Sequence, residues 1–216
     1  MTIALAFIQK ITIMGLAQPQ PTYTVEEYLA LERQLEERHQ YLDGQIYAMA
    51  GESLEHSTIC FNLATTLGVQ LRGKDCRGLS PNIKTYSGPP IKEQRTTKGM
   101  FSYTDVTVVC SEPLFHDEHR DVLLNPAVII EVLSPTTEAF DRGEKFLRHR
   151  THIEIMTDYV LVSQFRPLIE YFLRQAGGQW LYSSVGELES SLYLASIDCR
   201  LRLSEVYDRI TFPLEE

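Results

Sequence analysis

Residues 128–133 read Val-Ile-Ile-Glu-Val-Leu, a run that is apolar except for one acid. A second run, Val-Thr-Val-Val-Cys at residues 106–110, is also short and rich in β-branched side chains. This composition is typical of central strands that are buried on both faces. The two runs therefore predict the middle of a β-sheet, and Glu131 stands out as a carboxylate inside it.

Helices are predicted on both sides of these strands in the sequence. Thr24 and Glu27 have the spacing of a capping box, which starts a helix that we expect to reach about Glu37. Apolar residues that recur every four positions from Ile59 onward predict a second helix ending near Gly73. Ser134-Pro135 predicts the entry to a third helix over about 138–150.

Further strands are expected around this centre. An Asp43-Gly44 turn precedes one strand, and a hairpin is predicted around Ala176-Gly177-Gly178. The remaining expected elements are strands at 45–50, 79–86 and 159–162, a largely loop-like stretch at 87–103, and a closing helix at 203–210. The order predicts an α/β domain with a central mixed sheet, helices on its faces and a C-terminal β-hairpin, without the regular alternation of a doubly wound fold.

Composition limits the class of protein. A chain of 216 residues with 44% hydrophobic and 23% charged residues is typical of one globular domain, which we expect over 22–216. The net charge of -9 argues against a generic basic coat for nucleic acid, and no apolar run is long enough to span a membrane. The four cysteines form no CxxC pair, so we expect reduced thiols in a cytoplasmic protein.

Residues 1–21 are expected to lie outside the domain. They are apolar but lack a basic start, and Lys10 interrupts the run, which argues against a signal peptide. We interpret them as a flexible leader, or as a start codon assigned too early, with Met14 as the alternative initiator.

Two acids stand where buried strands are predicted. Asp105 begins one strand and Glu131 lies inside the other, and a buried carboxylate is costly unless it is paired or binds a metal. Mg²⁺ or Mn²⁺ prefers such oxygen ligands, and the Val132 carbonyl could be a third. Lys145 on the following helix could orient or deprotonate a water, or neutralise charge on a phosphate. The alternative is purely structural: a capping aspartate, a paired glutamate and a solvated lysine.

Several segments together resemble a known family. They are residues 37–44 (ERHQYLDG), 103–106 (YTDV), 131–138 (EVLSPTTE), 141–145 and 159–162. In order and spacing these are similar to the Uma-two family, which is described as restriction endonucleases and resembles the PD-(D/E)xK nucleases. The resemblance spans roughly residues 22–185. It implies a restriction-endonuclease-like core and hydrolysis of phosphodiester bonds, with Asp105 and Glu131 as metal ligands. It also implies that Lys145 replaces the lysine expected at Leu133.

The sequence departs from the family pattern at three positions. Thr104 replaces a proline, Gln40 replaces an acid that can contact metal, and Asn82 replaces an aspartate. Glu37 could compensate for Gln40 if the segment is helical, since positions three apart share a helix face. His56, before the periodic face of the second helix, is a supporting candidate that could equally make a structural hydrogen bond.

Basic residues cluster around these segments. Residues 72–98 carry a net charge of +5 (seven cations, two acids), and a second cluster lies at 142–150. Phosphate contacts are therefore expected from Lys84, Arg142 and Arg148. The leading hypothesis is a metal-dependent DNA endonuclease, expected to be a homodimer. The alternative is a catalytically weakened descendant that binds nucleic acid or a protein without cleaving.

Overall fold

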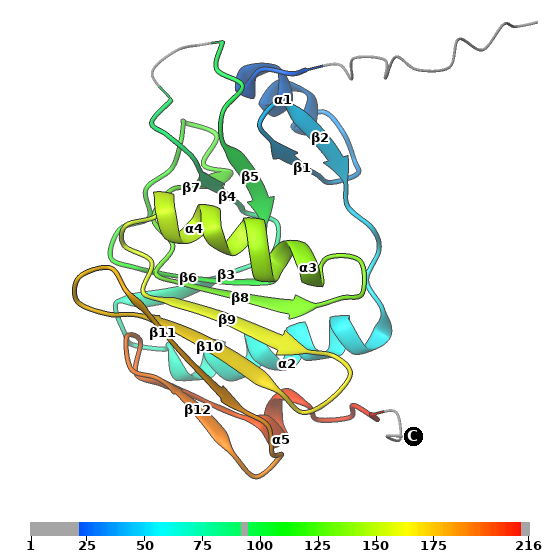
Figure 1. Cartoon of the computed structure of the whole chain (residues 1–216), viewed down its shortest axis with the longest axis vertical. Helices are drawn as coiled ribbons and strands as arrows, with labels where there is room; N and C mark the ends of the chain where they lie inside the picture. The colour runs from blue at the N-terminus through cyan, green and yellow to red at the C-terminus, as the bar shows by residue number, and fades with distance from the viewer. Residues whose placement is uncertain (1–21, 92–94, 213–216) are drawn as a thin grey trace, which may run out of the picture.

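The computed structural model describes residues 22–91 and 95–212, so the expected leader lies outside the described residues. The described strands form two large sheets and one two-stranded sheet; of the large sheets in Figure 1, one lies beside α1 and the other lies between α2 and α4. Among the described helices, none is long and apolar enough to cross a membrane.

The larger sheet has six strands in the order β11-β10-β9-β8-β6-β3. β8 runs parallel to β9, and the other neighbours are antiparallel, so the sheet is mixed as predicted. The predicted central strands and the predicted hairpin β10–β11 are confirmed. The bounds are β3 (Cys76–Leu79), β6 (Val106–Cys110), β8 (Val128–Leu133), β9 (Asp158–Ser163), β10 (Ile169–Arg174) and β11 (Trp180–Val185).

Side chains of β8 alternate between the two faces of this sheet. Val128, Ile130 and Val132 pack in the core that contains α2 (Leu54–Gln70). Ile129 and Leu133 pack in a second core, on the side of α4 (Phe146–His152). Because successive strand residues point to opposite faces, Glu131 points to the side of α4 and not of α2.

The helix on that side is not regular throughout. It begins as α3 (Glu138–Phe140), passes through a five-residue π-helical turn (Asp141–Lys145) and continues as α4. Single π-turns within α-helices are often found at functional sites. Here the turn buries both of its end residues, Asp141 and Lys145, toward Glu131.

The smaller sheet has the order β2-β1-β5-β4-β7 and packs α1 (Val25–Glu32) against an aromatic core of Tyr28, Tyr41 and Phe101. Its strands are β1 (His39–Leu42), β2 (Gln45–Ala48), β4 (Lys84–Ser87), β5 (Met100–Tyr103) and β7 (Val122–Leu123). A separate C-terminal hairpin, β12 (Ser191–Leu194) with β13 (Cys199–Arg202), and the short helix α5 (Leu203–Val206) follow these two sheets in the chain.

Several predicted boundaries were wrong. The first helix keeps its capping box but ends at Glu32, and Glu37 lies in an exposed bend. The strand expected at 79–86 is divided between β3 and β4, and the expected loop at 87–103 contains β5. The closing helix is shorter than expected, and β12 and β13 were not predicted. Strands of four residues, such as β12 and β13, are too short to show a clear alternation of polar and apolar side chains.

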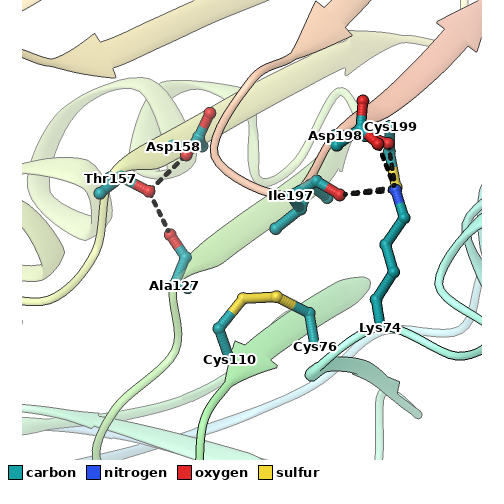
Figure 2. The surroundings of a disulfide bond; sticks show 9 residues. All are labelled: Lys74, Cys76, Cys110, Ala127, Thr157, Asp158, Ile197, Asp198 and Cys199. Atoms are coloured by element: carbon teal, nitrogen blue, oxygen red, sulfur yellow. Dashed lines mark hydrogen bonds and ion pairs between the residues drawn. A yellow bond between two sulfur atoms is a disulfide. The ribbon is translucent and has the colours of Figure 1, made fainter.

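The expectation of reduced thiols is wrong for two of the four cysteines. Cys76 and Cys110 form a disulfide, although 34 residues separate them in sequence (Figure 2). They lie directly opposite each other on the antiparallel strands β3 and β6. Cys60 and Cys199 are free. Sequence spacing does not reveal strand register, so the pairing was invisible without the sheet.

Candidate metal and catalytic centre

A pocket of about 680 Å³ opens where β8, the π-turn and the entry to β6 meet. Asp105, Glu131, Asp141 and Lys145 all line it, and we call these four residues the pocket cluster. Asp105 lies just before β6, Glu131 lies within β8, and the two strands pair antiparallel. The structure therefore brings together the two acids and the lysine that the sequence singled out.

Lys145 is buried, and its ammonium lies against two carboxylates and one backbone carbonyl. Its Nζ lies 2.8 Å from Glu131 Oε1 and 3.2 Å from Asp141 Oδ1, and it donates to the Tyr103 carbonyl at 3.1 Å. Burial alone would lower the pKa of Lys145, but the charges of Glu131 and Asp141 outweigh it and raise the pKa. The ammonium therefore stays charged, which favours an electrostatic or positioning role over that of a base.

Carboxyl groups outnumber ammonium groups in the pocket cluster. Three carboxylates face one ammonium. Burial raises the pKa of Glu131, and Asp141 and Asp105 raise it further against the lowering effect of Lys145. A divalent cation would relieve this excess, and carboxylate oxygens are the ligands that Mg²⁺ and Mn²⁺ prefer. The residues present therefore fit such an ion.

Asp105 is held in place from two sides. The backbone N–H of Val132 donates to its Oδ2 at 2.6 Å, and His56 Nε2 lies 3.4 Å from the same oxygen. Burial lowers the pKa of His56, but hydrogen bonding and the charge of Asp105 dominate and raise it, with a smaller contribution from the backbone of Val132. The predicted supporting histidine therefore contacts a predicted metal ligand directly.

The other supporting candidates are placed differently. Gln40 lines the pocket from β1, on the strand position opposite Tyr47. Glu37 is exposed and is not part of the pocket wall, because the segment is not helical, so it does not compensate for Gln40. Asn82 is also outside the wall and accepts a hydrogen bond from Arg38.

The three predicted phosphate contacts are already engaged by acids. Lys84 is buried and pairs with Asp121 at 3.0 Å, so its ammonium is not presented at the surface. Arg142 pairs with Glu138 and Glu170, and Arg148 with Asp43 and Glu144. The count of charges along the sequence missed acids that fold in from distant segments, such as Asp43, Asp121 and Glu170.

Two residues of the site were missed. Asp141 lies four residues before Lys145 and is buried beside it; the signal was this spacing within the segment 141–145 that carries the resemblance. Cys60 lies one turn after His56, with its Sγ 3.5 Å from His56 Nδ1. The four-residue period of apolar side chains predicted a helix that packs in the core, and it gave no sign of a role for Cys60.

Fold and site together define a nuclease-like α/β protein with a buried carboxylate–lysine cluster at one pocket. The family described as "Putative restriction endonuclease" (Uma2) matches residues 25–204, and the chain belongs to this family. Two uncharacterised Synechocystis proteins, slr1290 and sll1609, are 34% and 30% identical to it. The first alignment covers 90% of this chain and 96% of the relative, and the second covers 75% and 86%.

A solved structure shows the same fold. It is a crystal structure from Anabaena variabilis, titled a putative nuclease belonging to DUF820, and it superposes with a TM-score of 0.68 at 16% identity. The match covers 87% of this chain and 99% of that one. The predicted resemblance and the predicted fold class are thereby confirmed.

Proposed function

We propose that the protein is a divalent-metal-dependent endonuclease that hydrolyses phosphodiester bonds in DNA. The observation that carries the proposal is the excess of carboxyl groups over ammonium groups in the pocket cluster, with Glu131 and Asp141 buried. Membership of a family described as restriction endonucleases supports the reaction class and the DNA substrate.

Asp105, Glu131 and the Val132 carbonyl would hold the ion, Mg²⁺ or Mn²⁺. When bound, the ion supplies Lewis acidity at a phosphate oxygen and lowers the pKa of a coordinated water. The chain's own groups prepare this site. Lys145 holds Glu131 and Asp141 in position, and the Val132 N–H and His56 fix the orientation of Asp105.

Lys145 also places a permanent positive charge beside the position of the phosphate. Its raised pKa keeps the ammonium protonated, and burial among protein dipoles strengthens its field. In this role the lysine stabilises negative charge that develops on the phosphoryl oxygens. A homodimer would place two such sites on one duplex, since a two-fold assembly repeats each site on both strands.

Supercoiled plasmid in Mg²⁺ or Mn²⁺ tests the proposal. We expect nicking or linearisation by the native protein and loss of at least about 100-fold in rate for Asp105→Ala and Glu131→Gln. Asp117→Asn is the matched control, because Asp117 is a paired acid outside the pocket. Cleavage that persists in highly purified Asp105→Ala protein would overturn the assignment.

One observation favours a second candidate, a weakened relative that binds without cleaving. Gln40 lines the pocket at a position where the family pattern has an acid, and an amide adds no charge to the site. This candidate predicts that Gln40→Glu strengthens metal binding and gives or increases cleavage. Tight Mg²⁺ binding by the unaltered protein, with no gain in Gln40→Glu, would exclude it.

A further inference from the structure

A second set of ligand atoms lies on the α2 side of Asp105. His56, Cys60 and Asp105 each offer one atom, and these three atoms all lie within 4.8 Å of one another. We propose that the three residues form a second cation site, which takes a borderline-soft divalent ion such as Zn²⁺ or Co²⁺ and competes with Mg²⁺ for Asp105.

The backbone already arranges these side chains. His56 and Cys60 are four residues apart on α2 and therefore share one face of the helix. Asp105 Oδ2 lies 3.4 Å from His56 Nε2. Cys60 Sγ lies 3.5 Å from His56 Nδ1, the other nitrogen of the ring. Bonds to zinc are about 2.0–2.3 Å long, so two ligands of one ion lie within about 4.6 Å. The three ligand atoms, which lie within 4.8 Å of one another, would have to move closer by side-chain rotation to share one ion.

Access and charge also favour an ion here. His56 and Asp105 line the pocket, whereas Cys60 is half-buried beside them, so an entering ion meets nitrogen and oxygen before sulfur. Glu52 adds a further carboxylate, 3.8 Å from His56 Nδ1 and 39% exposed. Two carboxylates, those of Asp105 and Glu52, therefore flank the imidazole and the thiol.

The donor set separates this site from the pocket cluster. Mg²⁺ and Mn²⁺ are bound by oxygen ligands, whereas thiolate and imidazole favour Zn²⁺ and Co²⁺. Binding breaks the S–H bond of Cys60 and forms a sulfur–metal bond; the thiol proton, and the second proton of the His56 ring where it is present, are released to solvent. Because Asp105 belongs to both donor sets, an ion held by Cys60 withdraws Asp105 from the pocket cluster. The inhibition that follows rests on the proposed endonuclease function, but the binding itself does not.

Cobalt spectroscopy tests the binding without any nuclease assay. Co²⁺ added to the full-length protein in thiol-free buffer is expected to give a sulfur-to-cobalt charge-transfer band at one equivalent. Cys60→Ser should abolish the band and weaken Co²⁺ binding by at least about 10-fold. Cys199→Ser is the matched control, since Cys199 is the other free cysteine and lies away from the pocket, so its band should be unchanged.

Two results would overturn the site: absence of the band in the native protein, or an equal band in Cys60→Ser. Circular dichroism of each variant confirms that it is folded, and His56→Gln provides an independent variant that should also lose affinity.

A cleavage assay in Mg²⁺ then tests the competition. Zn²⁺ should inhibit the native protein and Cys199→Ser at concentrations at least about 10-fold lower than those that inhibit Cys60→Ser. Equal inhibition of all three proteins would overturn the sharing of Asp105. Failure of the native protein to cleave would count against the endonuclease, while the cobalt spectra would still decide the binding site.

Discussion

Two groups of interacting charges in this molecule differ in their balance. The pocket cluster sets three carboxylates against one ammonium and lines a pocket. A second group, the Asp121 network of Arg33, Lys84, Asp117 and Asp121, sets two cations against two acids and lies outside that pocket. Both contain a buried lysine, so burial of charge alone does not mark a functional site.

Charge balance and access are what separate the two groups. In the Asp121 network, Arg33 binds both oxygens of Asp121, and Lys84 pairs with the same carboxylate. Each charge there has a protein partner, which is the pattern of a structural ion pair. In the pocket cluster the excess negative charge faces a space large enough for an ion and a substrate group. The following tests address this contrast, from the largest expected effect to the smallest.

Removal of each buried lysine should separate the groups most clearly. Lys145→Met leaves Glu131 and Asp141 buried without their cation, so we expect the free energy of unfolding to fall by about 3–5 kcal/mol. Lys84→Met leaves Asp121 paired with Arg33, and a smaller loss of about 1–3 kcal/mol is expected. Urea denaturation in EDTA measures both, and an equal or larger loss in Lys84→Met would contradict the comparison.

Divalent ions should stabilise one group and not the other. At Mg²⁺ or Mn²⁺ near 100 times its dissociation constant, the native protein should gain about 2.7 kcal/mol in unfolding free energy. Glu131→Gln should lose most of this gain, because it removes a ligand charge. Asp117→Asn is the control and should retain the gain, as measured by thermal unfolding with and without the ion. An equal gain in Glu131→Gln would place the ion elsewhere.

Acid should weaken the balanced network. Burial raises the pKa of Asp121, but hydrogen bonds and charge from Arg33 and Lys84 outweigh it and lower the pKa well below its ordinary value. A lowered pKa in the folded state means that the stabilisation is complete above the unfolded-state pKa of about 3.9 and is lost as pH falls. Unfolding free energy should therefore fall more steeply below pH 4 in the native protein than in Asp121→Asn. Parallel pH profiles would contradict this.

The smallest effect is expected at a cation that is already paired. Arg142 contacts Glu138 and Glu170, so Arg142→Gln should leave the slope of log Kd against log salt for DNA binding unchanged. An arginine that binds phosphate would reduce that slope by about one unit when removed. Fluorescence anisotropy over a salt series measures the slope, and a change of that size would restore Arg142 as a phosphate contact.

The sequence predicted the parts of the molecule where period and composition are strong. The two β-branched runs, the capping box at Thr24 and the positions of Asp105 and Glu131 were all readable locally. Lys145 was inferred from its place on the helix that follows Glu131, fourteen residues on, and the resemblance then supported it.

Other features depend on which segments meet in space. The pairing of Cys76 with Cys110 follows from strand register, and the burial of Lys84 follows from the position of Asp121. Asp141 is brought to Lys145 by a π-turn that no local propensity predicts. The disulfide and the burial of Lys84 are properties of the tertiary structure, and no period in a single sequence reports them, whereas the spacing of Asp141 and Lys145 was visible locally.

The third partner of Lys145 is the main-chain carbonyl of Tyr103. Every amino acid supplies such a carbonyl, so substitution of the side chain at 103 leaves the acceptor in place as long as β5 stays paired with β4. The position of this carbonyl depends on the register of β5 with β4 and not on which amino acid occupies position 103. An alanine scan would therefore not detect the contact between Lys145 and this carbonyl, because an alanine at position 103 retains the acceptor.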